Sequence, residues 1–195
     1  MGLFAVLTCF GCEFLISVTD PQIRCDRGDG AACDRLGDQY FNGTGVEQDK
    51  AKAASLYQQG CAGGEAAACS QLGWMYEKGD GVEVNLESAT SLYQRACDGG
   101  NGYGCNNRGR MYQFGWGLRD GKGDVAAPDL VKAVSFYQRS CDARFSVGCG
   151  NLGWMYDHGA GVAEDHERAA GLFRGRRRYL AHPWKSQRDP GSPPR

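Results

Sequence analysis

The chain has 195 residues, with 22 Lys and Arg against 23 Asp and Glu, for a net charge of −1. This length allows one domain or two small ones, and the near-neutral charge argues against wholesale binding to nucleic acid or to a membrane surface. Two counts are unusual: 30 Gly, and 10 Cys, which is too many for an ordinary cytosolic enzyme.

The N-terminal stretch from residue 2 to residue 18 is apolar except for Glu13, and it is too short and too interrupted for a membrane span. We interpret residues 1–24 as a signal-peptide-like segment and linker, although a positive n-region is missing. Gly11-Cys12 resembles a bacterial lipoprotein cleavage site, so Cys12 is a candidate for lipidation, with plain secretion as the alternative. Cys9 and Cys12 also have redox spacing, but no strand-based domain surrounds them.

The other eight cysteines form four pairs with seven residues inside each pair. The first members of successive pairs are 36, 36 and 44 residues apart, so one copy carries eight extra residues. A period in this range predicts a helical repeat array. The pairs are Cys25 and Cys33, Cys61 and Cys69, Cys97 and Cys105, and Cys141 and Cys149.

Each pair leads into a predicted first helix. In the first copy, Cys33, Leu36, Gly37 and Tyr40 recur at i, i+3, i+4 and i+7, on one stripe of an α-helix. The glycine on this stripe lets a neighbouring helix approach closely. A Gly-x-Gly element then ends the helix, because glycine adopts the left-handed C-cap conformation without steric cost. These elements are Gly43-Thr44-Gly45, Gly79-Asp80-Gly81, Gly115-Trp116-Gly117 and Gly159-Ala160-Gly161.

A second helix follows in each copy, with Asp49, Asn85, Asp129 or Asp165 as its predicted N-cap. One hairpin cannot bury its own apolar stripe, so copies must stack on one another. The predicted fold class is therefore all-α: a disulfide-clamped α-solenoid of about four helix-turn-helix repeats of 36–44 residues. It spans residues 25–173, with repeats at 25–60, 61–96, 97–140 and 141–173.

The repeat pattern stops after Phe173. Residues 174–195 hold seven basic residues and four of the six prolines. We predict a basic, Pro-rich, disordered tail, with contact between Arg176-Arg177-Arg178 and an anionic partner as the alternative.

The motifs Leu72-Gly73-x-x-Tyr76-x-x-Gly79-x-Gly81-Val82 and Ala89-x-x-Leu92-Tyr93 resemble the Sel-1-like repeat, a relative of the tetratricopeptide repeat. With its paired cysteines, the chain is most similar to the Helicobacter cysteine-rich protein branch. The third copy departs from the pattern, since Arg108 replaces a leucine and the following loop is longer. The resemblance implies the solenoid fold, and the branch implies penicillin binding or β-lactamase activity without naming a residue for it.

The paired cysteines are predicted to form disulfides. Residues eight apart on one straight helix would lie ~12 Å apart, beyond the ~7 Å limit for a disulfide, so the chain must turn between them. Each bridge then clamps one hairpin to the next. Zinc is the rival interpretation, but structural zinc sites favour two to four residues between paired ligands. We expect no metal and no cofactor.

The first helices also carry a candidate binding surface. Asp38, Trp74, Arg110 and Trp154 share one register. Trp and Met side chains on the inner face of a solenoid suit an extended peptide or a glycan fragment. The alternative is that they fill the gap between hairpins. The neighbouring candidates are Met75, Met111 and Met155, together with Asn106, Asn107 and Asn151.

The standard serine β-lactamase motifs are missing, as there is no Gly-x-Ser-x-Gly, Ser-x-x-Lys or Lys-Thr-Gly. We therefore predict a monomeric scaffold that binds a protein or peptide, or else a cell-wall fragment, and no nucleic acid. Its predicted location is the periplasm, the cell envelope or the extracellular space, with possible anchoring through the N-terminus. The alternatives are β-lactam hydrolysis or binding for the function, and the mitochondrial intermembrane space for the location.

Overall fold

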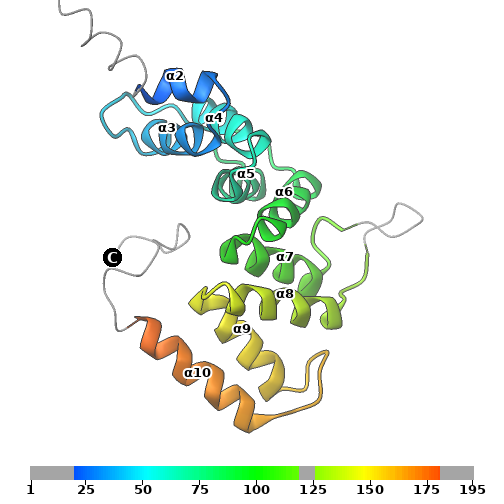
Figure 1. Ribbon diagram of the computed structural model, residues 1–195. Helices are drawn as coiled ribbons and strands as arrows, with labels where there is room; N and C mark the ends of the chain where they lie inside the picture. Colours follow the sequence, from blue (N-terminus) through cyan, green and yellow to red (C-terminus); the bar gives the residue numbers. More distant parts are fainter. Residues whose placement is uncertain (1–19, 119–125, 181–195) are drawn as a thin grey trace, which may run out of the picture.

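The computed structural model describes residues 20–118 and 126–180, with side chains up to Arg174. Every regular element within these residues is a helix, which confirms the predicted all-α class (Figure 1). The helices are α2 (Pro21–Asp26), α3 (Gly30–Asn42), α4 (Lys50–Ala62), α5 (Ala66–Lys78), α6 (Leu86–Asp98), α7 (Gly102–Phe114), α8 (Leu130–Asp142), α9 (Ser146–Asp157) and α10 (His166–Leu180).

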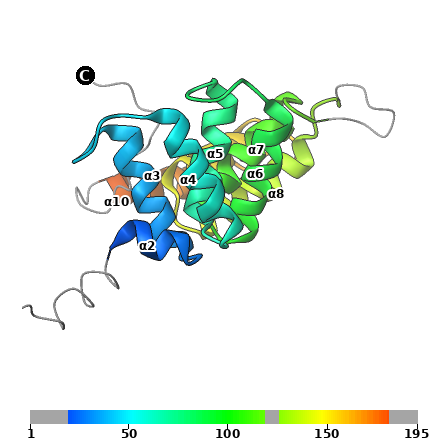
Figure 2. The same cartoon turned by 90° about the horizontal axis from the view of Figure 1, so that it is seen from above.

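The helices form four successive hairpins, α3 with α4, α5 with α6, α7 with α8 and α9 with α10, which stack into one array (Figure 1; Figure 2). Each second helix packs on the first helix of the next hairpin. The first helices α3, α5, α7 and α9 also contact one another in sequence, more closely than the second helices do. The first helices therefore lie on the inner side of the array, as in other α-solenoids.

Four disulfides form between the predicted partners, and three of them join consecutive hairpins. Cα atoms within each pair are 4.4–4.6 Å apart. Cys25 on α2 is bonded to Cys33 on α3, so the short helix α2 takes the place of a second helix before the first hairpin. The other bonds are Cys61–Cys69 from α4 to α5, Cys97–Cys105 from α6 to α7, and Cys141–Cys149 from α8 to α9.

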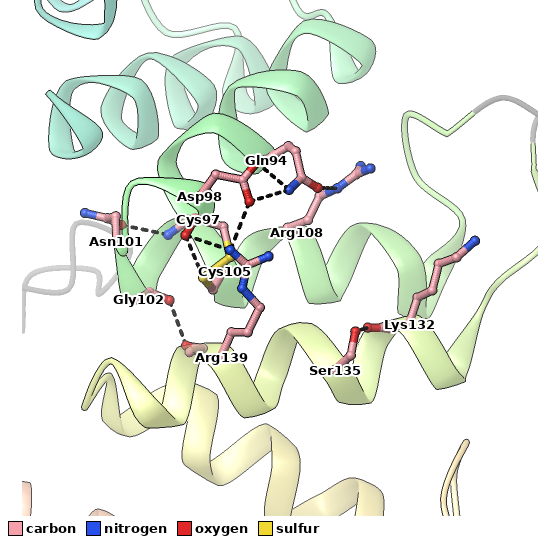
Figure 3. The surroundings of a disulfide bond; sticks show 12 residues. Gln94, Cys97, Asp98, Asn101, Gly102, Cys105, Arg108, Lys132, Ser135 and Arg139 are labelled. Atoms are coloured by element: carbon pink, nitrogen blue, oxygen red, sulfur yellow. Dashed lines mark hydrogen bonds and ion pairs between the residues drawn. A yellow bond between two sulfur atoms is a disulfide. The ribbon is translucent and has the colours of Figure 1, made fainter. Parts of the chain in front are cut away.

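Polar contacts surround the Cys97–Cys105 disulfide and tie the next hairpin to it (Figure 3). The guanidinium of Arg139 on α8 donates to the Cys97 carbonyl oxygen at 3.0 Å and to the Asp98 carboxylate at 2.9 Å. The Ser140 hydroxyl donates to the Gly102 carbonyl oxygen at 2.7 Å. Arg95 repeats the arginine contact one hairpin earlier, at the Cys61 carbonyl oxygen. The two arginine contacts add to the backbone hydrogen bonds that Gly64 and Gly100 already donate to the Cys61 and Cys97 carbonyl oxygens.

The four predicted N-caps are confirmed, as are three of the four predicted glycine C-caps. Carboxylate or amide oxygens of Asp49, Asn85, Asp129 and Asp165 accept from the backbone N–H three residues on, at 2.8–2.9 Å. The first glycine of the Gly-x-Gly element is the left-handed C-cap of α3, α5 and α7, whereas His158 ends α9 and Gly159 follows it at positive φ.

Each first helix has a glycine four residues after its cysteine, and this glycine makes room for an aromatic ring of the second helix. A Cβ atom on Gly109 would lie 2.8 Å from the Tyr137 ring, closer than van der Waals contact allows. The prediction of close helix approach is thus confirmed. The same pairing recurs in the other hairpins, as Gly37–Tyr57, Gly73–Tyr93 and Gly153–Phe173.

Two small residues meet beside each internal disulfide. A Cβ on Gly104 would lie 2.5 Å from the Cβ of Ala96, and a Cβ on Gly60 would lie 2.8 Å from the Cβ of Ala68. One partner must therefore be glycine, but either helix can supply it. This close crossing brings the adjacent cysteines within bonding distance.

We expect Gly104→Ala to lower the free energy of unfolding by about 1 kcal/mol, because the overlap with Ala96 outweighs the gain in helix propensity. The double variant Ala96→Gly/Gly104→Ala reproduces the arrangement of Gly60 and Ala68 and should recover most of that loss. Urea unfolding followed by circular dichroism measures both. A double variant no more stable than the single one would show that the overlap is not the cause.

Two predicted boundaries are wrong. Residues 20–24 were assigned to a linker, but Asp20 caps α2 and Pro21 occupies its first turn, an arrangement that favours helix initiation. The tail was predicted to be disordered from residue 174, but α10 continues to Leu180, since the next proline is Pro183. The predictions for Cys9, Cys12 and residues 181–195 lie outside the described residues. Within the described part, no helix is long and apolar enough to cross a membrane.

Candidate binding face of the first helices

The predicted row of surface residues crosses all four first helices. Asp38, Trp74, Arg110 and Trp154 lie on α3, α5, α7 and α9, which contact one another in that order. Trp154 is 43% exposed, and the other three side chains are half-buried. We call this row, with the aromatic side chains that flank it, the first-helix face.

Aromatic and cationic groups flank the row. The Trp154 ring stacks on the His158 ring, with centroids 4.4 Å apart. Phe114 and Trp116 stack at 4.7 Å and remain 48% and 42% exposed. The Arg110 guanidinium lies 5.7 Å from the Trp116 ring centroid. Exposed aromatic rings beside a guanidinium group are suited to bind a protein surface.

Sequence reasoning missed Phe114, Trp116 and His158 as members of this face. A signal was present for two of them, because Phe114 and His158 follow Arg110 and Trp154 by four residues and so share their side of the helix. Trp74 contacts Phe41 edge to face at 5.8 Å, so the aromatic contacts begin at α3.

The three methionines are not part of the face. Met75, Met111 and Met155 have no exposed surface, so the expectation that they bind a partner is wrong and the gap-filling alternative holds. Each follows a row residue directly, and one step along a helix turns the side chain by about 100° into the core.

The asparagines are engaged within the protein. Asn106 and Asn107 are buried, and Asn151 is half-buried and donates to the Asn106 side-chain oxygen at 2.7 Å. Asn107 accepts from the Arg110 guanidinium at 3.1 Å. The prediction that Asn106 and Asn107 reach a ligand is therefore wrong, whereas that for Asn151 stays a prediction. The Asn151–Asn106 bond connects α9 to α7, and Asn107 orients Arg110.

Tyrosine hydroxyls from the second helices fix acidic and amide groups near the face. Tyr57 donates to Asp38 at 2.7 Å, and Tyr93 donates to Glu77 at 2.8 Å. Burial alone raises the pKa of Glu77, but the hydrogen bonds from Lys78 and Tyr93 outweigh it and hold the pKa below its usual value. Glu77 therefore stays ionised beside Arg110, at 3.8 Å.

The fourth hairpin has Phe173 where the other copies have tyrosine, so its first helix receives no such hydroxyl. The carboxylate at this end, Asp157, instead contacts His166 Nδ1 at 2.9 Å. That hydrogen bond and the nearby Glu164 raise the pKa of His166. The start of α10 in the last hairpin thus carries a histidine that favours its cationic form.

In the first hairpin, α3 carries an acidic side chain whose burial is unfavourable. Asp34 has one buried oxygen without a hydrogen-bond partner. Burial, followed by repulsion from Asp38 and Glu65, raises its pKa to about 7. The later copies have Ser70, Asn106 and Gly150 at this position, all without charge.

We expect Asp34→Asn to stabilise the protein by about 1–2 kcal/mol at about pH 8, after discounting for the part of the side chain that remains solvated. Because the folded pKa of about 7 exceeds the ordinary aspartate value of 3.8, native Asp34 binds its proton more tightly than the unfolded chain does. Its contribution to stability is therefore lost as the pH rises toward 7. Urea unfolding at about pH 4 and pH 8 should show the gain only at the higher pH. Equal gains at both would contradict this assignment.

A family model described as the Sel1 repeat matches residues 30–65, 66–101, 102–145 and 146–174. Each match holds one helix pair and begins five residues after the predicted border, so each of the last three disulfides joins two repeats. A comparison with curated proteins finds no match.

Two solved structures share the fold. A Sel1 repeat protein from Oxalobacter formigenes is 24% identical with a TM-score of 0.71, over 85% of this chain and 62% of that one. The protein c5321, a protective antigen of uropathogenic Escherichia coli strains displaying an SLR fold, is 25% identical with a TM-score of 0.71, over 86% of this chain and 36% of that one. This chain thus spans less than two thirds of either structure.

Proposed function

This chain belongs to the Sel1 repeat family, and from that premise we propose that it is an exported scaffold that binds a protein or peptide partner on its first-helix face. Sel1 repeats generally mediate protein–protein interaction. The observation that carries the proposal is the exposure of Phe114, Trp116 and Trp154 on or directly after the first helices, since aromatic anchors are usual in interfaces.

Export is supported by the disulfides. Four bonded pairs in so small a protein are typical of an oxidising compartment. We propose a repeat domain that begins near Cys25 and is preceded by a targeting segment, with Cys12 as the residue to test for lipidation. The periplasm, the cell envelope and the extracellular space all fit, as does the mitochondrial intermembrane space.

The binding proposal is tested by recovering partners from a cell-envelope extract with the immobilised protein. We expect Trp74→Ala/Trp154→Ala to lose the partners that the parent protein retains. Because Trp74 also packs against the core, Phe114→Ala/Trp154→Ala is a second variant that removes exposed rings only. Equal recovery by all variants would place the binding surface elsewhere.

The control variant is Val84→Ala/Val131→Ala, which removes apolar side chains that are 61% and 68% exposed outside the first helices. It should retain the partners. Loss in this variant as well would show that any exposed apolar group contributes.

The β-lactamase alternative receives no support from the comparisons, which match the Sel1 repeat and two solved structures of that fold. We therefore propose binding and not hydrolysis. Nitrocefin turnover that survives further purification would contradict this choice.

A further inference from the structure

The junction between α8 and α9 differs from the three junctions before it. The earlier turns place a glycine at positive φ, namely Gly28, Gly64 and Gly100. The last turn has Arg144 at φ 62°, the sole described residue other than glycine with positive φ. A side chain with a Cβ is disfavoured in this conformation, so the turn is less stable than its counterparts.

The same junction lacks a helix cap. The side chains of Asp29, Glu65 and Asn101 accept hydrogen bonds from the first turns of α3, α5 and α7. Phe145 occupies this place before α9 and makes no such bond. The N-terminal turn of α9 therefore opens at a lower cost than the others.

The disulfide at this junction is also the least protected. The other seven bonded cysteines are at most 4% exposed, whereas Cys141 is half-buried at the edge of its core cluster. Cys141 is therefore the most exposed of the eight bonded cysteines, and its disulfide is the one that a small nucleophile reaches most readily.

We propose that Cys141 is a modification site, at which a low-molecular-weight thiol such as glutathione forms a mixed disulfide while the three other disulfides stay intact. The incoming thiolate attacks Cys141 Sγ, a sulfur–sulfur bond to Cys141 forms, and the bond to Cys149 breaks. The electron pair leaves on Cys149 Sγ as a thiolate. A second thiol then releases Cys141, so that two thiols are oxidised to one disulfide and the protein gains two thiols.

The direction of attack follows from the two helix positions. Cys149 lies in the first turns of α9, where the helix dipole stabilises a thiolate, so it is the better leaving group. Cys141 lies near the C-terminal end of α8, which disfavours a thiolate there. This proposal does not depend on the proposed binding function.

The test exposes the full oxidised chain to graded glutathione, quenches it with iodoacetamide and maps the peptides without reduction. We expect the glutathione adduct on Cys141 and the alkylated thiol on Cys149. Exchange there should be about tenfold faster than at Cys97–Cys105, the ratio that 1.4 kcal/mol in opening free energy gives. Equal rates at all four disulfides, or an adduct on Cys149, would overturn the proposal.

Two variants show whether the junction sets the rate. Arg144→Gly/Phe145→Asn gives the α8–α9 junction the same residues as the α6–α7 junction, Gly100 and Asn101. It should slow exchange at Cys141 about tenfold, toward the rate at Cys97–Cys105. Phe145→Asn alone, which leaves the turn unchanged, should slow it by less. An unchanged rate in the double variant would overturn the role of the junction.

Discussion

Replacing Cys97 and Cys105 together by alanine is expected to lower the free energy of unfolding by about 2–3 kcal/mol, because the bond closes a short loop that the unfolded chain would otherwise leave open. The effect is large against a net stability of about 5–15 kcal/mol for a domain of this kind. Urea unfolding of the oxidised parent and of the variant, followed by helical circular dichroism, gives the difference.

The loss should be concentrated at the junction of α6 and α7, since a repeat array is stabilised mainly by contacts between neighbours. Native-state hydrogen exchange should therefore show faster opening of these two helices than of α3. The control is the parent protein after full reduction, which should lose more stability than the double variant. A variant within about 0.5 kcal/mol of the parent would contradict the clamp role.

Gly81→Ala is expected to lower the free energy of unfolding by about 3 kcal/mol, and the matched variant Gly45→Ala by about 1 kcal/mol. The two glycines occupy the same place in successive repeats and have nearly equal φ angles, 77° and 78°. A Cβ on Gly81 would lie 2.7 Å from the Lys50 carbonyl carbon in the previous repeat, whereas a Cβ on Gly45 meets nothing within 4 Å.

The difference between these variants therefore measures the contact between repeats, free of the backbone term that both share. Thermal and urea unfolding of the two variants should agree in sign and order. If Gly45→Ala lowers the free energy of unfolding as much as Gly81→Ala does, the contact between the Gly81 loop and α4 does not contribute to stability.

The repeat architecture could be predicted from the sequence because its landmarks recur. Eight cysteines in four equal pairs established both the period and the need for a turn between partners. An N-cap such as Asp49 accepts a hydrogen bond from the backbone three residues further along, so the local sequence was enough to predict it. The close approach at the helix glycines was also predicted, although not the aromatic ring that occupies the space.

The candidate site could be predicted only in part. Trp74 and Met75 are adjacent, and one residue's turn of the helix separates the half-buried row from the core. The side of α5 that faces the core is decided by how α6 and the neighbouring helices pack on it. Local sequence does not show this packing. The prediction for the asparagines was limited for the same reason, because a partner can lie on another helix, as Asn106 does for Asn151.

Arg108 shows a further limit. Its departure from leucine was evident in the sequence, but its accommodation was not: Nε donates to Gln94 on α6 at 3.0 Å, and the guanidinium lies 4.4 Å from the Tyr112 ring centroid. Tyr112 is the tyrosine that recurs in every first helix, and Gln94 recurs as Gln58 and Gln138, but the repeat pattern does not show that an arginine would lie between them.

Covalent linkage between neighbouring helix pairs is the claim on which this account depends most, and peptide mapping of unreduced protein tests it directly. Protein isolated from an oxidising compartment should yield Cys25 linked to Cys33, Cys61 to Cys69, Cys97 to Cys105 and Cys141 to Cys149. Free thiols at the first three pairs, or links between cysteines of different pairs, would contradict it.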